Sequence, residues 1–185
     1  MLTTRLSAAL FAAPLLLMPA AAVASAWTVD PDTSRLGFEV AQGENLVAGQ
    51  FTDWTAAIEF DPDAPEAAEI SAEIQTATTT TGIGQLDGML PGDQWFAAGQ
   101  FPAAEFTSTD VRLVDGNTYV ADGTVRIRGI SQPVTLTFTL EIDGDTAQAK
   151  GTATLDRTVF GVGEGVGLDQ VAAAVTVTFD LTANR

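Results

Sequence analysis

The feature that most constrains this chain is an alternation of apolar and polar residues that returns along its length. From 134 to 142 every second residue is apolar: Val134, Leu136, Phe138, Leu140 and Ile142. Threonine or glutamate stands at each position between them. A period of two puts all the apolar side chains on one face of a strand. The same pattern over 54–60, 70–74 and 171–181 predicts an all-β protein, whose half-buried antiparallel strands must pack their apolar faces against something.

Turn sequences divide the chain into about eight strands. We expect strands over 35–41, 47–60 (bent near Asp53), 69–79, 105–114, 118–128, 133–142, 147–155 and 171–182. Asp115-Gly116-Asn117 and Asp143-Gly144-Asp145 are typical of tight hairpins, because Gly and Asn accept the positive φ that such turns require. Eight closely connected strands favour a closed antiparallel barrel, since closure removes the exposed edges of an open sheet.

The first 26 residues have the pattern of an export signal. Arg5 is the single charge before an apolar run from Leu6 to Met18, and Ala24-Ser25-Ala26 forms a small-x-small cleavage site. This pattern predicts a secretory signal peptide over 1–26, cleaved after Ala26, and one domain over 27–185. The chain has no cysteine, which suits the bacterial periplasm better than a disulfide-dense extracellular module.

Composition excludes several classes of function. The chain has 24 acidic residues against 8 basic ones and no histidine, so a nucleic-acid partner is not expected. Without His and Cys, the common zinc, copper and iron sites lose their ligands. Ser131 lies in a near match to a nucleophile elbow, but no histidine can serve as its base. The acidic residues over 61–69 lack the spacing of a calcium loop. We expect no metal, no cofactor and no catalysis.

Arg157 stands at the end of a predicted strand and opens a glycine-rich stretch over 161–167. Such a stretch predicts a loop. Nearby Glu164 and Asp169 oppose an anion, so the glycines are not a phosphate cradle.

Several short pieces, in order along the chain, resemble the YceI-like family of periplasmic proteins that bind polyisoprenoids and related long-chain lipids. They are Trp27-Thr28-Val29-Asp30, Val47-x-Gly49-x-Phe51, Asp87-x-x-Leu90 with Trp95-Phe96, Phe101-Pro102 with Phe106, Gly123–Val134, and Arg157-x-x-Phe160-Gly161. The resemblance implies a lipocalin-like antiparallel eight-stranded β-barrel, with a long apolar tunnel that holds an isoprenoid or similar tail. The residues alone leave open whether the barrel is hollow or filled with side chains.

With such a tunnel, ten apolar residues become candidates for contact with the ligand. They are Phe38, Phe51, Leu86, Met89, Leu90, Phe96, Phe106, Ile127, Phe138 and Phe160. The segment 86–96 breaks the strand alternation and contains Gly88, Pro91 and Gly92, so we expect a short helical or irregular lid over the tunnel entrance. The family commonly has Arg-Asp-x-His-Leu where this chain has Leu86-Asp87-Gly88-Met89-Leu90, and this apolar mouth suits a neutral head group better than a phosphate.

The sequence therefore predicts an exported, non-catalytic protein that holds one long-chain isoprenoid or other amphiphilic lipid for transport, storage or sequestration. A small outer-membrane β-barrel is the alternative, because alternation by itself does not tell an apolar face turned inward from one turned outward to lipid. An enzyme is a weaker alternative. The oligomeric state stays open, with a homodimer as one possibility.

Overall fold

Eleven antiparallel strands form a single sheet in the computed structural model, which describes residues 25–185. All of the predicted signal peptide before Ser25 lies outside the described residues. The strands are β1 (Ser25–Val29), β2 (Arg35–Gln42), β3 (Asn45–Phe51), β4 (Trp54–Phe60), β5 (Glu69–Gln75), β6 (Thr79–Thr80), β7 (Ala103–Asp115), β8 (Thr118–Ile127), β9 (Ile130–Asp143), β10 (Thr146–Asp156) and β11 (Val171–Asn184).

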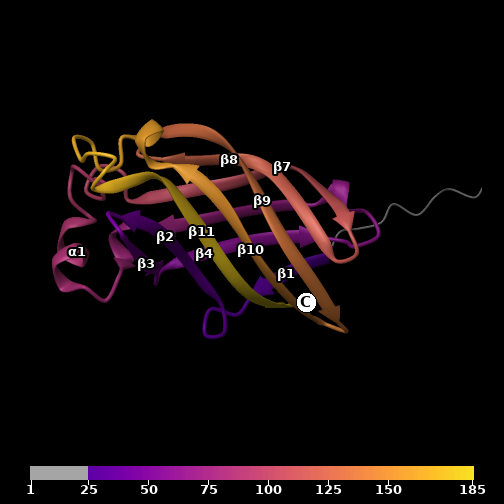
Figure 1. The fold of residues 1–185 in the computed structure, drawn as a ribbon. Helices are drawn as coiled ribbons and strands as arrows, with labels where there is room; N and C mark the ends of the chain where they lie inside the picture. Colours follow the sequence, from indigo (N-terminus) through magenta and orange to yellow (C-terminus); the bar gives the residue numbers. More distant parts are fainter. Residues whose placement is uncertain (1–24) are drawn as a thin grey trace, which may run out of the picture.

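Eight of these strands close into the predicted barrel (Figure 1). The order β1-β4-β5-β7-β8-β9-β10-β11 returns to β1, which pairs with the end of β11 through Thr28↔Asn184 and Val29↔Ala183. The fold class is therefore confirmed. The strand β1 was not among the predicted strands, because five residues are too few for alternation to register.

The predicted bend near Asp53 is present, but it divides the predicted strand over 47–60 into two strands, because the chain turns a corner at Thr52–Asp53. The strand β3 pairs with β2 and β6, whereas β4 pairs with β1 and β5. Both Phe51 and Trp54 face the interior although they are three residues apart, and a continuous strand cannot hold that change of phase. The backbone N–H of Asp53 donates to the hydroxyl of Thr78 at 3.1 Å, which holds the corner.

The predicted strand over 69–79 is also interrupted. The strand β5 ends at Gln75, and the 3-10 turn η2 (Thr76–Thr78) leads into the two-residue strand β6. The hydroxyl of Thr76 donates to the carbonyls of Phe101 and Pro102, both at 3.0 Å. A buried threonine that bonds to backbone in this way competes with the sheet ladder and ends the strand.

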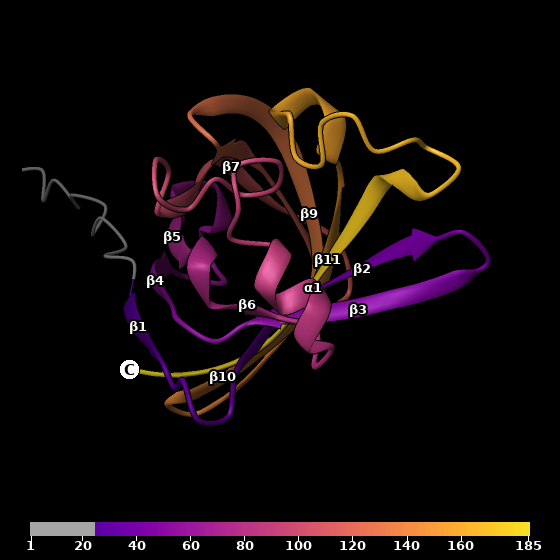
Figure 2. The same ribbon diagram turned by 90° about the vertical axis from the view of Figure 1, so that its left-hand side faces the viewer.

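The hairpin of β2 and β3 extends the sheet beyond the barrel (Figure 2). The strand β2 pairs with β11 from Arg35↔Asp180 to Gln42↔Val171. One edge of β11 is therefore paired with β2 along most of its length and with β1 at its C-terminal end. The short helix α1 (Gly84–Met89) lies across the end of the barrel from which this hairpin projects, as the view along the barrel in Figure 2 shows. The predicted interruption of the strand pattern by a short helical segment is confirmed.

Both predicted hairpin turns are present. Gly116 has φ +55° between β7 and β8, and Gly144 has φ +60° between β9 and β10. A residue with a side chain is strained in this left-handed region, so glycine sets the register of both hairpins.

Candidate lipid-binding tunnel

The barrel encloses an apolar cavity, called the tunnel below, of ≈ 220 Å³. Every described residue that lines the tunnel is apolar, and these residues come from all eight barrel strands as well as β2 and β3. Alternation accounts for this wall, since the inward residues of each strand are those at every second position. In β9 they are Val134, Leu136, Phe138, Leu140 and Ile142, as the sequence predicts.

Aromatic rings pack together around part of the tunnel. Where β1 closes onto β11, Phe60 meets Tyr119 edge-on at 5.4 Å between ring centroids. Tyr119 stacks on Phe138 at 5.6 Å, and Phe138 meets Phe179 at 6.3 Å. Phe60 and Phe138 belong to this packed cluster and also line the tunnel, so the cavity reaches into the cluster.

The lid segment, Leu86–Phe96, lies at the end of the barrel away from the β9–β10 turn (Figure 1). Phe96 reaches the tunnel and packs edge-on against Phe51, with ring centroids 5.9 Å apart. Arg128, in the turn between β8 and β9, donates to the carbonyls of Asp93 at 2.9 Å and Trp95 at 2.6 Å. These bonds hold the second half of the lid segment against the barrel.

Asp87 holds the first half. Its carboxylate accepts hydrogen bonds from the backbone N–H of Thr81 at 2.6 Å, from the Thr81 hydroxyl at 2.7 Å and from the Thr80 hydroxyl at 2.8 Å. The bond from the Thr81 N–H is the main cause that lowers the pKa of Asp87, and the two hydroxyls add to it. The charged form of Asp87 therefore fastens α1 to β6.

Five of the ten predicted contact residues line the tunnel. They are Phe51, Phe96, Phe106, Ile127 and Phe138. Phe38 lies behind Phe51, with ring centroids 5.7 Å apart, and Phe160 is buried in a second cluster with Val134 and Ala153. In the lid segment, Leu86 and Leu90 are half-buried, and Met89 is 40 % exposed beside Trp95 on an outer groove. Direct contact with a ligand stays a prediction for all ten residues.

Most of the aliphatic residues of the tunnel wall are absent from the predicted contact residues. Leu36, Ile58, Ile70, Leu155 and Val177 all line the tunnel. Alternation places these residues on the inner face of their strands, and that signal could have identified them. The ten predicted residues are mostly aromatic instead.

The tunnel offers no polar partner to a ligand. Among the described residues, no buried side-chain nitrogen or oxygen lacks a hydrogen bond. The indole N–H of Trp27, for example, donates to the carbonyl of Phe60 at 3.1 Å. Hydrophobic and dispersion contacts are the interactions this wall can make, and a hydrocarbon chain is the ligand that they suit.

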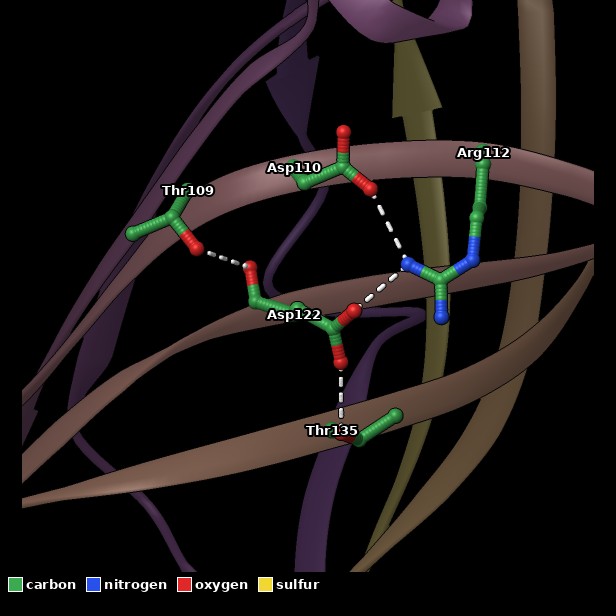
Figure 3. A network of polar contacts seen from close by, with 5 residues as sticks. All are labelled: Thr109, Asp110, Arg112, Asp122 and Thr135. Carbon is green, nitrogen blue, oxygen red and sulfur yellow. Dashed lines mark hydrogen bonds and ion pairs between the residues drawn. The ribbon is translucent and has the colours of Figure 1, made fainter.

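The outer face of the barrel is polar. Arg112 bridges Asp110 and Asp122, and the hydroxyl of Thr135 donates to Asp122, as Figure 3 shows. The Thr135 hydroxyl and then Arg112 lower the pKa of Asp122. Lys150 pairs with Asp180 at 3.0 Å on the neighbouring strands. Such exposed pairs add little stability, but they show which face of the sheet meets water.

Within residues 25–185, no three acidic, histidine or cysteine side chains gather where they could hold a metal ion. Over the same residues, no helix has the length and apolar character to span a membrane.

Residues 27–183 match the family model of the YceI-like domain. The chain belongs to the YceI-like family. A UPF0312 protein of Pseudomonas syringae pv. tomato is 26% identical over 182 residues, which cover 94% of each chain. Protein YceI of Salmonella arizonae is 29% identical over 136 residues, which cover 72% of this chain and 71% of that protein. The family predicted from the short sequence pieces is confirmed.

Solved structures of related proteins share the fold. The crystal structure of Burkholderia cenocepacia BcnA has a TM-score of 0.80 and 28% identity, over 84% of this chain and 99% of that one. A polyisoprenoid binding domain from Saccharophagus degradans has a TM-score of 0.69 and 15% identity, over 88% of this chain and 98% of that one. The YceI-like barrel is thus retained although the sequences differ widely.

Proposed function

We propose that this protein holds the tail of one long-chain isoprenoid or comparable lipid in its tunnel, without catalysis, and carries or stores it in the periplasm. The observation that carries the proposal is the uninterrupted apolar wall of the tunnel. Moving a hydrocarbon tail from water into such a wall yields about 0.8 kcal/mol per CH₂ group. Ten groups give roughly 8 kcal/mol before association costs, which corresponds to about micromolar binding.

The relatives support this ligand class. The chain shares its family with YceI proteins, and a structural neighbour is described as a polyisoprenoid binding domain. The described part of the tunnel wall has no side chain that could act as a general base or a nucleophile, and the sequence has no His or Cys. Both observations support binding without catalysis.

The head group of the lipid would stay outside the tunnel, at the end that carries the lid segment. A charged head group drawn into this wall would lose its water and find no partner, at a cost of many kcal/mol. Leu86 and Met89 stand where the family commonly has arginine and histidine, so the lid segment supplies no cation for a phosphate at those positions. A neutral head group fits these residues best.

The polar outer face argues against the outer-membrane alternative. A barrel in a membrane turns its apolar residues outward to lipid. Here the apolar residues of β9 face the tunnel, while Arg112, Asp122 and Lys150 lie outside in ion pairs.

Cleavage after Ala26 would remove the first two residues of β1. The mature chain would then begin at Trp27, which is buried and pairs with Ile58 of β4. N-terminal sequencing of the exported protein should read Trp-Thr-Val-Asp. A chain that retains residues 6–18 would contradict the proposal.

The binding proposal is tested by mass spectrometry of lipids extracted from protein purified without detergent. We expect a long-chain lipid at about one per protein. Ala72→Phe adds a ring to the tunnel wall and should abolish retention, whereas Ser71→Phe adds the same ring to the exposed face of the same strand and should preserve it. Circular dichroism checks that both variants fold. Absence of lipid from the wild type, or equal retention by the two folded variants, would contradict the proposal.

A further inference from the structure

The strands β9 and β10 separate before either of them ends. Their pairing runs from Asp143↔Thr146 to Thr137↔Thr152 and stops there. Beyond that point β9 stays paired with β8 as far as Ile130, and β10 stays paired with β11 as far as Asp156. The barrel wall is therefore split between residues 130–136 and residues 153–156, a region called the wall split below.

An outer groove of ≈ 800 Å³ runs across β8, β9 and β10 and includes the wall split. Val134 and Thr135 line it from β9, and Ala153 and Thr154 line it from β10. Val134 and Ala153 also line the tunnel, so at these two residues the groove and the tunnel lie on opposite sides of the same stretch of wall. The two ladders that flank the wall split, β8–β9 and β10–β11, stay hydrogen-bonded past it and separate the inside of the barrel from the outside on either side.

Phe160 packs against the wall split. It lies on the 3-10 turn η3 (Arg157–Phe160), which follows β10 directly and contacts β9. Its side chain is 2 % exposed and belongs to the cluster that contains Val134, Ala153 and Phe106. The ring makes apolar contacts, so moving it aside breaks no hydrogen bond.

Arg157 holds the backbone that carries Phe160. Arg157 is 5 % exposed, and its guanidinium donates to the carbonyls of Val162 at 2.8 Å, Gly163 at 3.1 Å, Val166 at 3.3 Å, Val171 at 2.7 Å and Ala172 at 2.9 Å. Asp156 accepts a bond from the N–H of Thr158 at 2.8 Å on the other side of the turn. With the turn clamped in this way, the movable part is the Phe160 side chain.

We propose that the wall split is a lateral port through which the lipid tail enters and leaves the tunnel, and that the Phe160 ring closes it. This inference rests on the proposed lipid-binding function. Opening the barrel between fully paired strands would break ladder bonds at about 1 kcal/mol each, whereas the wall split has none to break. Val134 and Ala153 offer the passing tail an apolar border at little desolvation cost.

The port is tested by bridging it. Because the chain has no cysteine, Thr135→Cys with Thr154→Cys can be joined selectively across the wall split by a short bis-methanethiosulfonate, which forms a reducible disulfide with each cysteine and releases methanesulfinate. The control is Glu141→Cys with Gln148→Cys, a pair of exposed residues opposite each other on the same two strands where these are already bonded. The measurement is the rate at which a fluorescent C15 isoprenoid alcohol passes from each protein to phosphatidylcholine vesicles.

We expect the bridge across the wall split to slow release at least about tenfold, which corresponds to about 1.4 kcal/mol in the barrier. Reduction of the crosslinker should restore the rate, and the control bridge should leave it unchanged. Equal rates in the two bridged proteins would overturn the port while leaving lipid binding intact. Failure of every form, including the unmodified protein, to take up the probe would overturn the binding proposal and the port with it.

The role of Phe160 is tested separately. Phe160→Ala should speed release of the same probe at least severalfold, whereas Val159→Ala, at the exposed neighbouring position, should not. A folded Phe160→Ala protein with the wild-type release rate would show that the ring does not close the port.

Discussion

Phe138 provides a quantitative test of which face of the sheet holds the protein together. Phe138 is 7 % exposed, its ring stacks on Tyr119, and it lies opposite Gly151 of β10. A Cβ at 151 would lie 2.5 Å from the Cβ of Phe138 and 2.5 Å from the ring of Phe179, so the glycine leaves room for both side chains. Phe138→Ala removes the stacked contact and leaves a void that the surrounding strands cannot fill.

Replacing a buried phenylalanine with alanine costs about 3–5 kcal/mol. Because one side of the Phe138 ring already faces the tunnel, we expect about 3 kcal/mol, the lower end of that range. For a domain of this size, that loss lowers Tm by about 6–12 °C. Thr137→Ala changes the adjacent, exposed residue and should cost about 1 kcal/mol or less, mainly through lower strand propensity.

Thermal and urea unfolding of lipid-free wild type, Phe138→Ala and Thr137→Ala, followed by circular dichroism, measures the difference. The urea slope should be the same in all three proteins if the unfolded states are alike. Equal losses for the two variants would refute the assignment of Phe138 to the interior and of Thr137 to the solvent face.

Three further predictions concern single side chains. Arg157→Lys keeps the charge but loses several of the bonds to buried carbonyls, and we expect a loss of about 3 kcal/mol, measured by urea unfolding. Gly151→Ala should lower Tm strongly, because its Cβ would meet the backbone carbonyl of Thr137 at 2.5 Å, whereas Gly88→Ala has open space and should leave Tm unchanged or raise it slightly. Because folding lowers the pKa of Asp87, its stabilisation of the lid segment is complete above the ordinary carboxyl pKa of about 4 and is lost as the pH falls below it. The lid segment of the wild type should therefore exchange its amide hydrogens faster in acid, and Asp87→Asn should remove this pH dependence.

Several parts of the fold could be read from local sequence. Alternation identified β7 to β11 nearly to their ends, and it assigned Leu136 and Phe138 to the interior. Gly116 and Gly144 located two hairpin turns. These features depend on the backbone geometry of a few adjacent residues, and a local pattern therefore carries them.

Other parts depend on contacts between distant residues. The corner at Thr52–Asp53 is held by Thr78, and the barrel closes because β1 reaches the end of β11. Sequence patterns predicted neither of these contacts. They also did not show that Phe160 would pack in a cluster with Val134 and Ala153, since an apolar residue gives the same sequence pattern whether it lines a tunnel or fills a core.

The sequence by itself determined the all-β class, the faces of the long strands and, through its short family pieces, the YceI-like family. Tertiary structure decided how much of the interior is hollow, which aromatic rings pack together around the tunnel, and where β9 and β10 part. The physical reason is that alternation states which side chains leave water, whereas the space between them depends on barrel closure and on the packing of side chains from strands far apart in the sequence.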